Sequence, residues 1–389
     1  MGLMSGTSAD GIDAALVEIT TEVHYPGVKL LHFESRPYPL GIRDRILHLP
    51  ANPDALREIC HLNVLLGELF AQAALDLLKA ADSSPAEVAL IGSHGQTICH
   101  LPAPVIEGDL VLRSTLQIGE PSVIAEQTGL CTVADFRPRD VAAGGEGAPL
   151  TPYPHYLLFG HPERCRVVLN IGGICNLTFL PPGAPFTEIS AFDAGPGNVL
   201  IDGMVRRLSG GVMDYDADGA WAASGRVTQA LLQRLLGHPF FRRPPPRSAG
   251  QEEFGPRMVD ELLVEADQRG IPPNDLAATL SAFSVEAVVG SLETHIFPRR
   301  TVDEILLCGG GVRNRWLREA LEARLAPCRV LITDEIGFPA QGVEAASFAV
   351  LAYLTFTGQP GNLPTATGAR QAVILGKIIP GKGYSGLGP

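Results

Sequence analysis

The sequence has little of what marks secreted and membrane proteins. Its seven cysteines are odd in number, widely spread and never form a C-x-x-C pair, so neither a zinc ribbon nor a disulfide framework is expected. No apolar run reaches the roughly 18 to 20 residues that cross a bilayer, and no cationic leader precedes an apolar segment at the start. We therefore expect the protein in the cytoplasm, with most cysteines acting as small buried hydrophobic residues.

An excess of basic residues is also missing. The 389 residues carry a net charge of −12 at pH 7, and an acidic surface repels both nucleic acid and anionic membranes. We therefore expect neither as a partner. Hydrophobic residues make up 46% of the chain and charged residues 19%, which is typical of a globular protein, and the length predicts two domains.

Two common catalytic motifs are absent as well. The chain has no G-x-x-x-x-G-K-[ST] string, which excludes a P-loop enzyme. It has no G-x-S-x-G elbow either, which argues against an α/β-hydrolase.

The chain does have a distinctive first stretch, Met1 to Asp13. It combines three glycines, three hydroxyl side chains and two aspartates among apolar residues, which predicts a tight β-hairpin. Gly6 and Gly11 permit positive φ and close backbone approach. The N–H groups of such a turn can wrap an anion, and Asp10 or Asp13 can hold a hydrated Mg²⁺ beside it. An ordinary Gly/Ser/Asp turn is the alternative.

The remainder of the first half predicts alternating helices and strands. We expect a strand over 28–35, a long helix over 54–80 from apolar residues at three- and four-residue steps, a buried strand over 88–91, a short helix over 121–128 and a strand over 131–135. The string Gly92 to Thr97 follows the buried strand. In such α/β folds, ligands are expected beyond the strand ends.

The second half repeats this opening. Residues 166–179 predict another strand, glycine turn and returning strand, and a strand over 187–192 leads into Asp193 and an apolar-periodic helix. The further predicted elements are helices over 255–269 and 273–297, a strand over 304–308 running into a Gly-Gly-Gly turn, a helix near Asn314, a strand over 329–333 and a helix over 343–357. The Pro/Arg-rich stretch 240–248 predicts a loop that is functional or mobile, because it cannot pack regularly. The tail from residue 358, rich in Gly and Pro, is expected along the surface.

These motifs together indicate a nucleotide site. Two opposed glycine-turned hairpins could cradle a triphosphate, and the turn Gly309 to Gly311 would let an adenosine lie flat on the backbone. Alternatively, that turn only joins a strand to a helix. The order of hairpin, hairpin, Gly-Gly-Gly turn and C-terminal helix resembles the actin, sugar kinase and Hsp70 ATPase superfamily.

The particular strings resemble one family of that superfamily, the anhydro-N-acetylmuramic acid kinases. The resembling segments are residues 2–13, 94–97, 134–137 with 144–150, 170–176, 192–198 and 308–314. The chain departs from the family pattern at Ala9, Glu146 and Ala194. Of these, Glu146 adds a charge beside the expected sugar pocket, which could alter substrate preference.

The resemblance implies an α/β fold of two actin-like (ribonuclease H-like) domains, with mixed sheets flanked by helices and the active site in the cleft between them. We expect the domains at 1–145 and 146–389, with the alternative that the last helix packs back on the N-terminal domain. The implied reaction uses ATP, Mg²⁺ and water to convert 1,6-anhydro-N-acetylmuramic acid into N-acetylmuramic acid 6-phosphate and ADP, in peptidoglycan recycling and amino-sugar catabolism. The resemblance also implies a homodimer.

The resemblance assigns roles to particular residues. Asp193 would be the general base, Arg137 would hold the lactyl carboxylate, Glu344 would support the catalytic water, and Asp10 is the first choice beside Mg²⁺. The residues implied for ATP are Gly6, Thr7, Ser8, Asp10, Gly11, Asn170, Gly172, Gly173, Asn176, Gly309, Gly310, Gly311 and Asn314. Those implied for the sugar are His94, Gln96, Thr97, Arg137, Gly147 and Asp193.

Most of these assignments have a structural alternative. Asp193 could be a helix N-cap, Glu344 could complement a helix dipole, and His94 could be a structural histidine. Arg137 and the nearby Arg139 could be solvated surface residues.

Two other functions remain open from the sequence. The enzyme could prefer another anhydrosugar such as levoglucosan, or the chain could be a non-catalytic ATP-switched module. A cation ready for the lactyl carboxylate, which Arg137 would supply, argues against the first. The carboxylate of Asp193 argues against the second.

Overall fold

The computed structural model describes residues 1–389 except 21–26, 184, 186–187, 251–252 and 383–389. The chain divides into two compact units, residues 1–158 with 341–389 and residues 159–340. This division differs from the expected one at 145/146. The C-terminal segment returns to the first unit because its helix and last strand pack on the first sheet.

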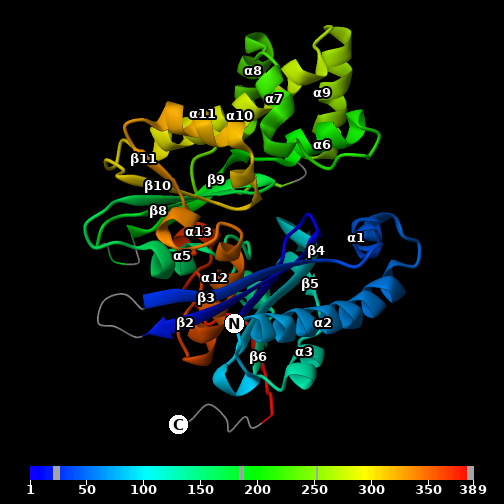
Figure 1. Cartoon of the computed structure of the whole chain (residues 1–389), viewed down its shortest axis with the longest axis vertical. Helices are drawn as coiled ribbons and strands as arrows, with labels where there is room; N and C mark the ends of the chain where they lie inside the picture. The colour runs from blue at the N-terminus through cyan, green and yellow to red at the C-terminus, as the bar shows by residue number, and fades with distance from the viewer. Residues whose placement is uncertain (21–26, 184, 186–187, 251–252, 383–389) are drawn as a thin grey trace. The chain divides into compact units, whose positions relative to one another are not determined.

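The first unit is built on a seven-stranded mixed sheet in the order β12-β6-β4-β1-β2-β3, with β5 paired to β4 (Figure 1). Its strands are β1 (Gly2–Ser5), β2 (Gly11–Thr20), β3 (Gly27–Pro37), β4 (Ile91–Glu107), β5 (Leu110–Ile118), β6 (Thr132–Ala134) and β12 (Lys377–Ile379). Its helices are α1 (Ile42–Leu47), α2 (Ala55–Ala80), α3 (Pro121–Thr128), α4 (Phe136–Ala142), α5 (Pro152–Phe159), α12 (Gly342–Phe356) and α13 (Pro364–Thr367).

Helices α2 and α12 cover opposite faces of this sheet. Alternation along β2 explains the arrangement, since every second side chain points to the same face. Ile12, Ala14 and Leu16 pack in the core formed with α2. On the other face α12 lies so close that a Cβ on Gly2 would come within 1.8 Å of the carbonyl oxygen of Ala345. Glycine is therefore required at this contact.

The second unit has a five-stranded sheet in the order β11-β10-β7-β8-β9. Its strands are β7 (Arg166–Ile171), β8 (Ile174–Leu180), β9 (Ser190–Pro196), β10 (Glu304–Cys308) and β11 (Arg329–Ile332). Its helices are α6 (Val199–Leu208), α7 (Ala220–Ser224), α8 (Gln229–Leu236), α9 (Pro256–Gln268), α10 (Pro273–His295) and α11 (Arg315–Leu325). Among the described helices, only α10 is long and apolar enough to span a membrane, and 83% of its apolar window is buried inside the protein.

The two sheets share one strand order. Each has an antiparallel meander of three strands, β1-β2-β3 or β7-β8-β9, whose first strand also pairs in parallel with a later strand, β4 or β10. A further parallel strand, β6 or β11, extends each sheet. The predicted α/β class with two mixed sheets flanked by helices is confirmed, and the repeated order is what two actin-like domains predict.

Three sequence-based expectations are wrong in detail. The predicted short strand at 88–91 begins only at Ile91 and runs to Glu107, pairing with β5 as a long arm. Asp193 lies within β9 rather than at a helix start, because the strand continues to Pro196. The tail beyond residue 358 is not simply a surface segment, since Asn362, Leu363 and Leu375 are buried. Residue 187 of the expected strand and residues 383–389 of the tail lie outside the described residues.

Candidate functional site

The turn between β1 and β2 is braced from beneath by Gln96. This side chain is fully buried, its Oε1 lies 2.7 Å from the hydroxyl of Ser5, and its Nε2 donates to the carbonyl of Gly6 across 3.0 Å. The phenol of Tyr38 also donates to Oε1, at 3.4 Å. Gln96, predicted to contact the sugar, therefore holds the shape of the predicted phosphate turn.

The outer side of the same turn is open. Thr7, Ser8 and Asp10 are exposed, and a Cβ on Gly6 would have only the Ser8 hydroxyl within 4 Å, at 3.8 Å. Gly11, by contrast, lies against the carbonyl of Arg36, where a Cβ would come within 2.2 Å. Gly11 thus serves the packing of β2 on β3, while the turn at Gly6 has room for an incoming anion.

Arg137 joins several of the predicted sugar residues in the first unit. From α4, its Nε donates to Nε2 of His94 across 3.0 Å, and its NH1 donates to the carbonyl of Gly147 across 2.7 Å. Burial lowers the pKa of Arg137 to about 10, against the opposite pull of Glu344 and Asp140. Arg137 is therefore no solvated surface cation, whereas Arg139 of the same helix is exposed.

Glu344 lies in the first turn of α12 and completes this group. Burial and the neighbouring charge of Asp13 raise the pKa of Glu344, while Arg137 acts in the opposite direction. His94 packs on the ring of Phe348, with centroids 4.5 Å apart. The structure thus brings together four residues predicted separately from distant parts of the sequence, namely His94, Arg137, Gly147 and Glu344.

Asp140 is a residue that the sequence reasoning missed. It is fully buried, and its carboxylate accepts hydrogen bonds from the N–H of Gly147 at 2.8 Å, from Asn362 at 2.7 Å and from Thr367 at 2.7 Å. Asp140 thereby ties the loop that holds Arg137 to the C-terminal segment. The sequence signal that could have identified Asp140 is its position three residues after Arg137, on the same short helix.

A hollow of about 400 Å³ lies beside His94 in the first unit. The residues that line it come from α2, β4, β5, β6, β12 and the start of α3. Ser93, on its wall, is 1% exposed and its hydroxyl has no hydrogen-bond partner among the described residues. Thr97 lies further along β4 and does not line this hollow, and its hydroxyl accepts a hydrogen bond from Gln117 at 3.2 Å.

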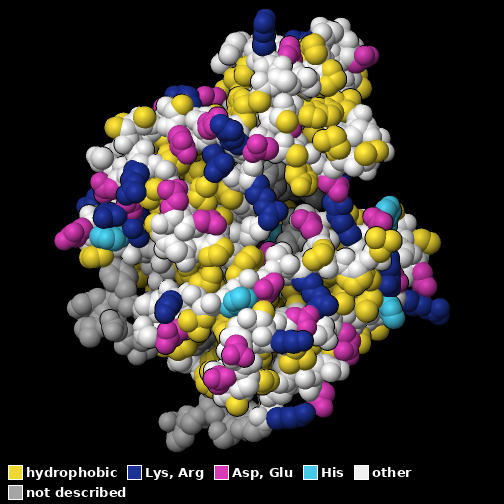
Figure 2. Space-filling view, in the orientation of Figure 1, with side chains coloured by type: hydrophobic (Ala, Val, Ile, Leu, Met, Phe, Trp, Pro, Cys, Tyr) yellow, Lys and Arg dark blue, Asp and Glu magenta, His cyan; other side chains and the backbone are white. Residues whose placement is uncertain are grey.

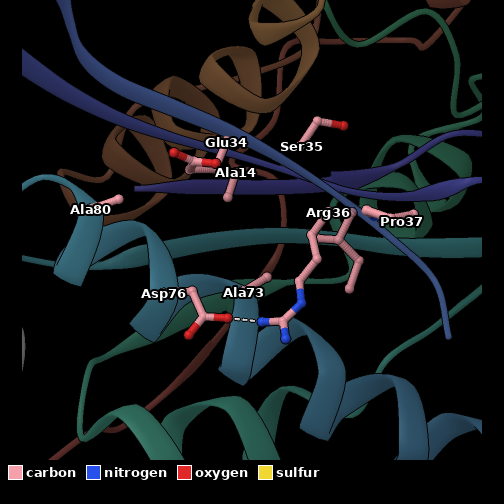
Figure 3. Close-up of a pocket in the computed structure, with 9 residues that line it drawn as sticks. Ala14, Glu34, Ser35, Arg36, Pro37, Ala73, Asp76 and Ala80 are labelled. Atoms are coloured by element: carbon pink, nitrogen blue, oxygen red, sulfur yellow. Dashed lines mark ion pairs between the residues drawn. The ribbon is translucent and has the colours of Figure 1, made fainter.

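Another hollow of about 330 Å³ lies between α2 and the strands β2 and β3. Figure 3 shows small side chains such as Ala14 and Ala73 around it, with an ion pair between Arg36 and Asp76. None of the residues predicted for ATP, sugar or metal lines it. The hollow follows from alanines where a helix crosses the sheet.

In the second unit, the Gly-Gly-Gly turn packs against the β7–β8 hairpin. A Cβ on Gly309 would lie 2.1 Å from Oδ1 of Asn170, and Gly309 has a φ of +84°. A Cβ on Gly311 would lie 2.2 Å from the side chain of Ile171. Gly310, between them, has no protein atom within 4 Å of such a Cβ. The turn is thus fixed on one side and has space on the other.

The other predicted nucleotide residues of this unit serve the hairpin or the helix next to it. Asn170 and Asn176 face each other across β7 and β8. The carbonyls of Gly172 and Gly173 accept hydrogen bonds from the backbone that leads into α6. Asn314 caps α11, with its side chain accepting from the N–H of Leu317 at 3.1 Å.

Asp193 lies on β9, opposite Asn176 of β8. One carboxylate oxygen, Oδ2, accepts a hydrogen bond from the N–H of Ala249 at 2.7 Å. Its backbone N–H donates to the carbonyl of Arg247 at 3.0 Å. The N-cap alternative is therefore wrong, because the Asp193 carboxylate is held by a loop rather than by a helix terminus.

Within the described residues, no group of three or more His, Cys, Asp or Glu side chains could by itself hold a metal. That fits Mg²⁺, which is commonly bound through one or two carboxylates, phosphate oxygens and water. Asp10 is exposed on the rim of the β1–β2 turn, and this is a suitable place for such a carboxylate.

Comparison with known proteins decides the family. The family model described as anhydro-N-acetylmuramic acid kinase matches residues 1–381. The chain belongs to this family. It is therefore a phosphotransferase that uses ATP.

Individual members of the family are similar over almost their whole length. The anhydro-N-acetylmuramic acid kinase of Caldanaerobacter subterraneus subsp. tengcongensis is 47% identical over 97% of this chain and 96% of its own. That of Gloeobacter violaceus is 44% identical over 98% of each chain. Among solved structures, component A of the Acidaminococcus fermentans (R)-2-hydroxyglutaryl-CoA dehydratase covers 90% of this chain and 96% of its own, with a TM-score of 0.45 and 12% identity.

Proposed function

We propose that the protein transfers the γ-phosphoryl group of ATP to O6 of 1,6-anhydro-N-acetylmuramic acid while water opens the anhydro bridge. The products are N-acetylmuramic acid 6-phosphate and ADP, and the reaction belongs to peptidoglycan recycling. The observation that carries the proposal is the group formed by His94, Arg137, Gly147 and Glu344. In this group, hydrogen bonds to His94 and to the Gly147 carbonyl fix the guanidinium of Arg137. A fixed guanidinium suits a sugar that bears a carboxylate.

The reaction needs one base for the water and a set of groups that stabilise the charge of the phosphates. A water molecule loses a proton to Asp193 and its oxygen bonds to C1, while the bond from C1 to O6 breaks. The electron pair released on O6 then forms the bond to the γ-phosphorus, and the bond from phosphorus to the bridging oxygen of ADP breaks. A positioned carboxylate base typically contributes about 10²- to 10⁴-fold to such a step.

The remaining rate enhancement comes from alignment of the phosphates. We assign this role to the turn around Gly6, Thr7 and Ser8 and to the turns at Gly172 and Gly310. A Cβ on Gly6 would meet only the Ser8 hydroxyl within 4 Å and one on Gly310 would meet no protein atom, so a phosphate or a nucleoside could approach there. Mg²⁺ would be held beside Asp10 and would neutralise phosphate charge. The residues present fit that ion, as described above.

The substrate is tested by measuring ADP release with Mg-ATP and each of three sugars. The sugars are 1,6-anhydro-N-acetylmuramic acid, levoglucosan and open-ring N-acetylmuramic acid. Turnover on the first sugar alone supports the proposal. Preference for levoglucosan, which lacks the lactyl carboxylate, would overturn the assigned role of Arg137. ATP binding without turnover on any sugar would favour the ATP-switched module.

We also propose that the protein is a homodimer joined through the arm formed by β4 and β5. According to the residue pairing, one face of this arm carries the side chains of Cys99, Leu101, Val105, Leu110, Leu112 and Leu116. The four leucines are between 38% and 60% exposed. Among the described residues, β5 pairs only with β4. An open strand edge can pair with a second copy about a twofold axis, which brings the same surface of both copies together.

The occupant of this face is inferred to be a second copy because the face is nearly uncharged. Glu107 is the one charged residue of this face among the paired positions. The face therefore favours neither a basic nor an acidic partner. On the face of the molecule in Figure 2, by contrast, Lys and Arg side chains are interspersed with Asp and Glu. Leu110→Asp with Leu112→Asp should give monomers in analytical ultracentrifugation, whereas Val212→Asp, at an 86% exposed position elsewhere, should not. A monomeric parent protein would contradict the proposal.

We place the protein in the cytoplasm, in agreement with seven free cysteines. Thiols are kept reduced in that compartment.

A further inference from the structure

The Pro/Arg-rich segment 240–248 lies along β9, the last strand of the second sheet. Its last arginine, Arg247, is only 6% exposed. The Nε of Arg247 donates to the carbonyl of Asp193 at 2.9 Å, and the Asp193 N–H donates back to the carbonyl of Arg247 at 3.0 Å. The segment therefore satisfies both backbone hydrogen-bonding groups of Asp193, the residue whose side chain is the proposed base.

The guanidinium of Arg247 is held on every side. Its NH1 donates to the carbonyl of Arg243 at 2.9 Å, and its NH2 donates to the hydroxyl of Ser291 on α10 at 2.8 Å. It also lies over the rings of Phe240 and Phe192, at 4.8 and 5.5 Å from their centroids. A planar group fixed by several directed hydrogen bonds and ring contacts has one orientation. Arg247 thus connects the segment, β9 and α10 rigidly.

Two residues further on, the chain reaches the carboxylate itself. The N–H of Ala249 donates to Oδ2 of Asp193 at 2.7 Å. A short hydrogen bond from a backbone N–H favours the charged form of a carboxylate and fixes its orientation. The position of this N–H depends on Arg247, because Arg247 anchors the segment two residues before it.

We propose that Arg247 is a positioning residue for Asp193, which acts by fixing the Ala249 N–H on the carboxylate of the base. This inference rests on the proposed function, in which Asp193 takes the proton from water. It gives the segment 240–248 a role in catalysis without contact to substrate. It also explains why an arginine is buried here with backbone carbonyls and a hydroxyl, rather than a carboxylate, as its hydrogen-bond acceptors.

Other charged or titratable groups act on the same carboxylate and on its anchor. The charge of Asp193 adds to burial in raising the pKa of Cys175, on the neighbouring strand β8, to about 12, so this thiol stays neutral. Burial and the charge of Arg243 lower the pKa of Arg247, while Asp193 raises it. Burial and Arg247 lower the pKa of His295 on α10. Cys175 therefore stays neutral, whereas His295 takes up its proton only in the acid range. The pH profile is also measured in His295→Gln, which separates the titration of His295 from that of the Asp193 carboxylate.

The test uses the full-length enzyme and follows kcat, KM and the pH profile of kcat. In Ala249→Pro the N–H is removed, whereas Ala249→Gly keeps it. Arg247→Lys keeps a positive charge but loses the directed hydrogen bonds. The control, Arg243→Lys, changes an exposed arginine of the same segment whose side chain donates to Glu253. We expect kcat to fall about 10²-fold in Ala249→Pro and Arg247→Lys, with KM for ATP little changed.

The pH profile separates positioning from mere folding. When the N–H is lost, the carboxylate is less stabilised, so the acid limb of kcat should move to higher pH by about one unit. A purely structural role would lower the melting temperature and leave that limb and the kcat of the folded enzyme unchanged, which would overturn the inference. Because Arg247→Lys retains the segment's charge, it keeps the test informative if Ala249→Pro does not fold.

A failure of the proposed function can be distinguished from a failure of this inference. If Asp193→Asn keeps full activity, then Asp193 is not the base and the proposed function is wrong. If Asp193→Asn is inactive but the acid limb stays fixed in Arg247→Lys and Ala249→Pro, only the positioning role is wrong.

Discussion

The Nε–H of Arg137 donates to Nε2 of His94 across 3.0 Å. This contact assigns the histidine tautomer, because Nε2 must accept and the ring proton is then on Nδ1. Nδ1 lies 2.9 Å from the carbonyl of Gly95, where that proton is donated. His94 is therefore neutral, and its ring sets the direction of the guanidinium that we assign to the sugar carboxylate.

The first prediction concerns stability in acid. Burial and the charge of Arg137 lower the pKa of His94 well below its ordinary value, whereas an unfolded chain binds a proton at about 6.5. The unfolded state therefore takes up the proton first as pH falls, and the folded state loses stability below about pH 6.5. His94→Gln should reduce the decline in melting temperature between pH 7.5 and pH 5.

Other histidines contribute in the same direction. Burial lowers the pKa of His100 to about 4 and that of His155 to about 3. The comparison must therefore be between His94→Gln and the parent protein. An identical decline in both would contradict the assignment of His94 as a neutral acceptor.

The second prediction concerns sugar affinity. Arg137→Lys keeps a positive charge but cannot make the two directed hydrogen bonds to His94 and Gly147, so the cation loses its fixed position. KM for the anhydrosugar should rise about 10- to 100-fold, since hydrogen bonds to charged groups are worth about 1.5–3 kcal/mol. Arg139→Lys, exposed on the same helix, is the matched control and should change KM little. Equal effects in both variants would remove Arg137 from the sugar site.

The third prediction uses two neighbouring glycines. In Gly309→Ala the new methyl group would lie 2.1 Å from Oδ1 of Asn170, at a φ of +84°. We expect a loss of about 1–3 kcal/mol in the free energy of unfolding. Gly310→Ala has no protein atom within 4 Å, so its melting temperature should stay near that of the parent while its affinity for ATP falls. If ATP affinity is unchanged in Gly310→Ala, the nucleoside does not lie on this turn.

The fourth prediction concerns the buried carboxylate of Asp140. In Asp140→Asn an amide N–H would face one of the donors of Gly147, Asn362 or Thr367, so one buried hydrogen bond is lost along with the charge. The free energy of unfolding should fall by about 2–4 kcal/mol. Asp135→Asn breaks only the ion pair with Lys377, whose side chain is 66% exposed, and should cost about 0–1 kcal/mol. Urea unfolding of both variants measures the difference, and equal losses would contradict the bracing role of Asp140.

Several parts of this structure follow from sequence pattern alone. The spacing of glycines, hydroxyls and aspartates around Gly6 predicts the β1–β2 turn, and the period of apolar residues predicts α2. These signals are local, because each depends on residues within one or two turns of chain. The family resemblance predicts that Arg137, His94 and Glu344 belong to one site.

Other parts depend on contacts between residues far apart in the chain. Asp140 bonds Thr367, 227 positions away, and Arg247 bonds Asp193, 54 positions away. The outer half of β4 was missed for another reason. Most of the arm is exposed on both strands, so burial imposes no period on its sequence. The family resemblance predicts that Gln96 contacts the sugar, whereas in the structure its side chain bonds Ser5 and Gly6 and braces the β1–β2 turn.

The most direct test of the account measures ADP and N-acetylmuramic acid 6-phosphate made from 1,6-anhydro-N-acetylmuramic acid by the parent enzyme and by Asp193→Asn. We expect equal amounts of the two products from the parent. In Asp193→Asn we expect the rate to fall about 10²- to 10⁴-fold, with ATP affinity unchanged. Absence of the sugar phosphate in the parent reaction, or an undiminished rate in Asp193→Asn, would contradict the account.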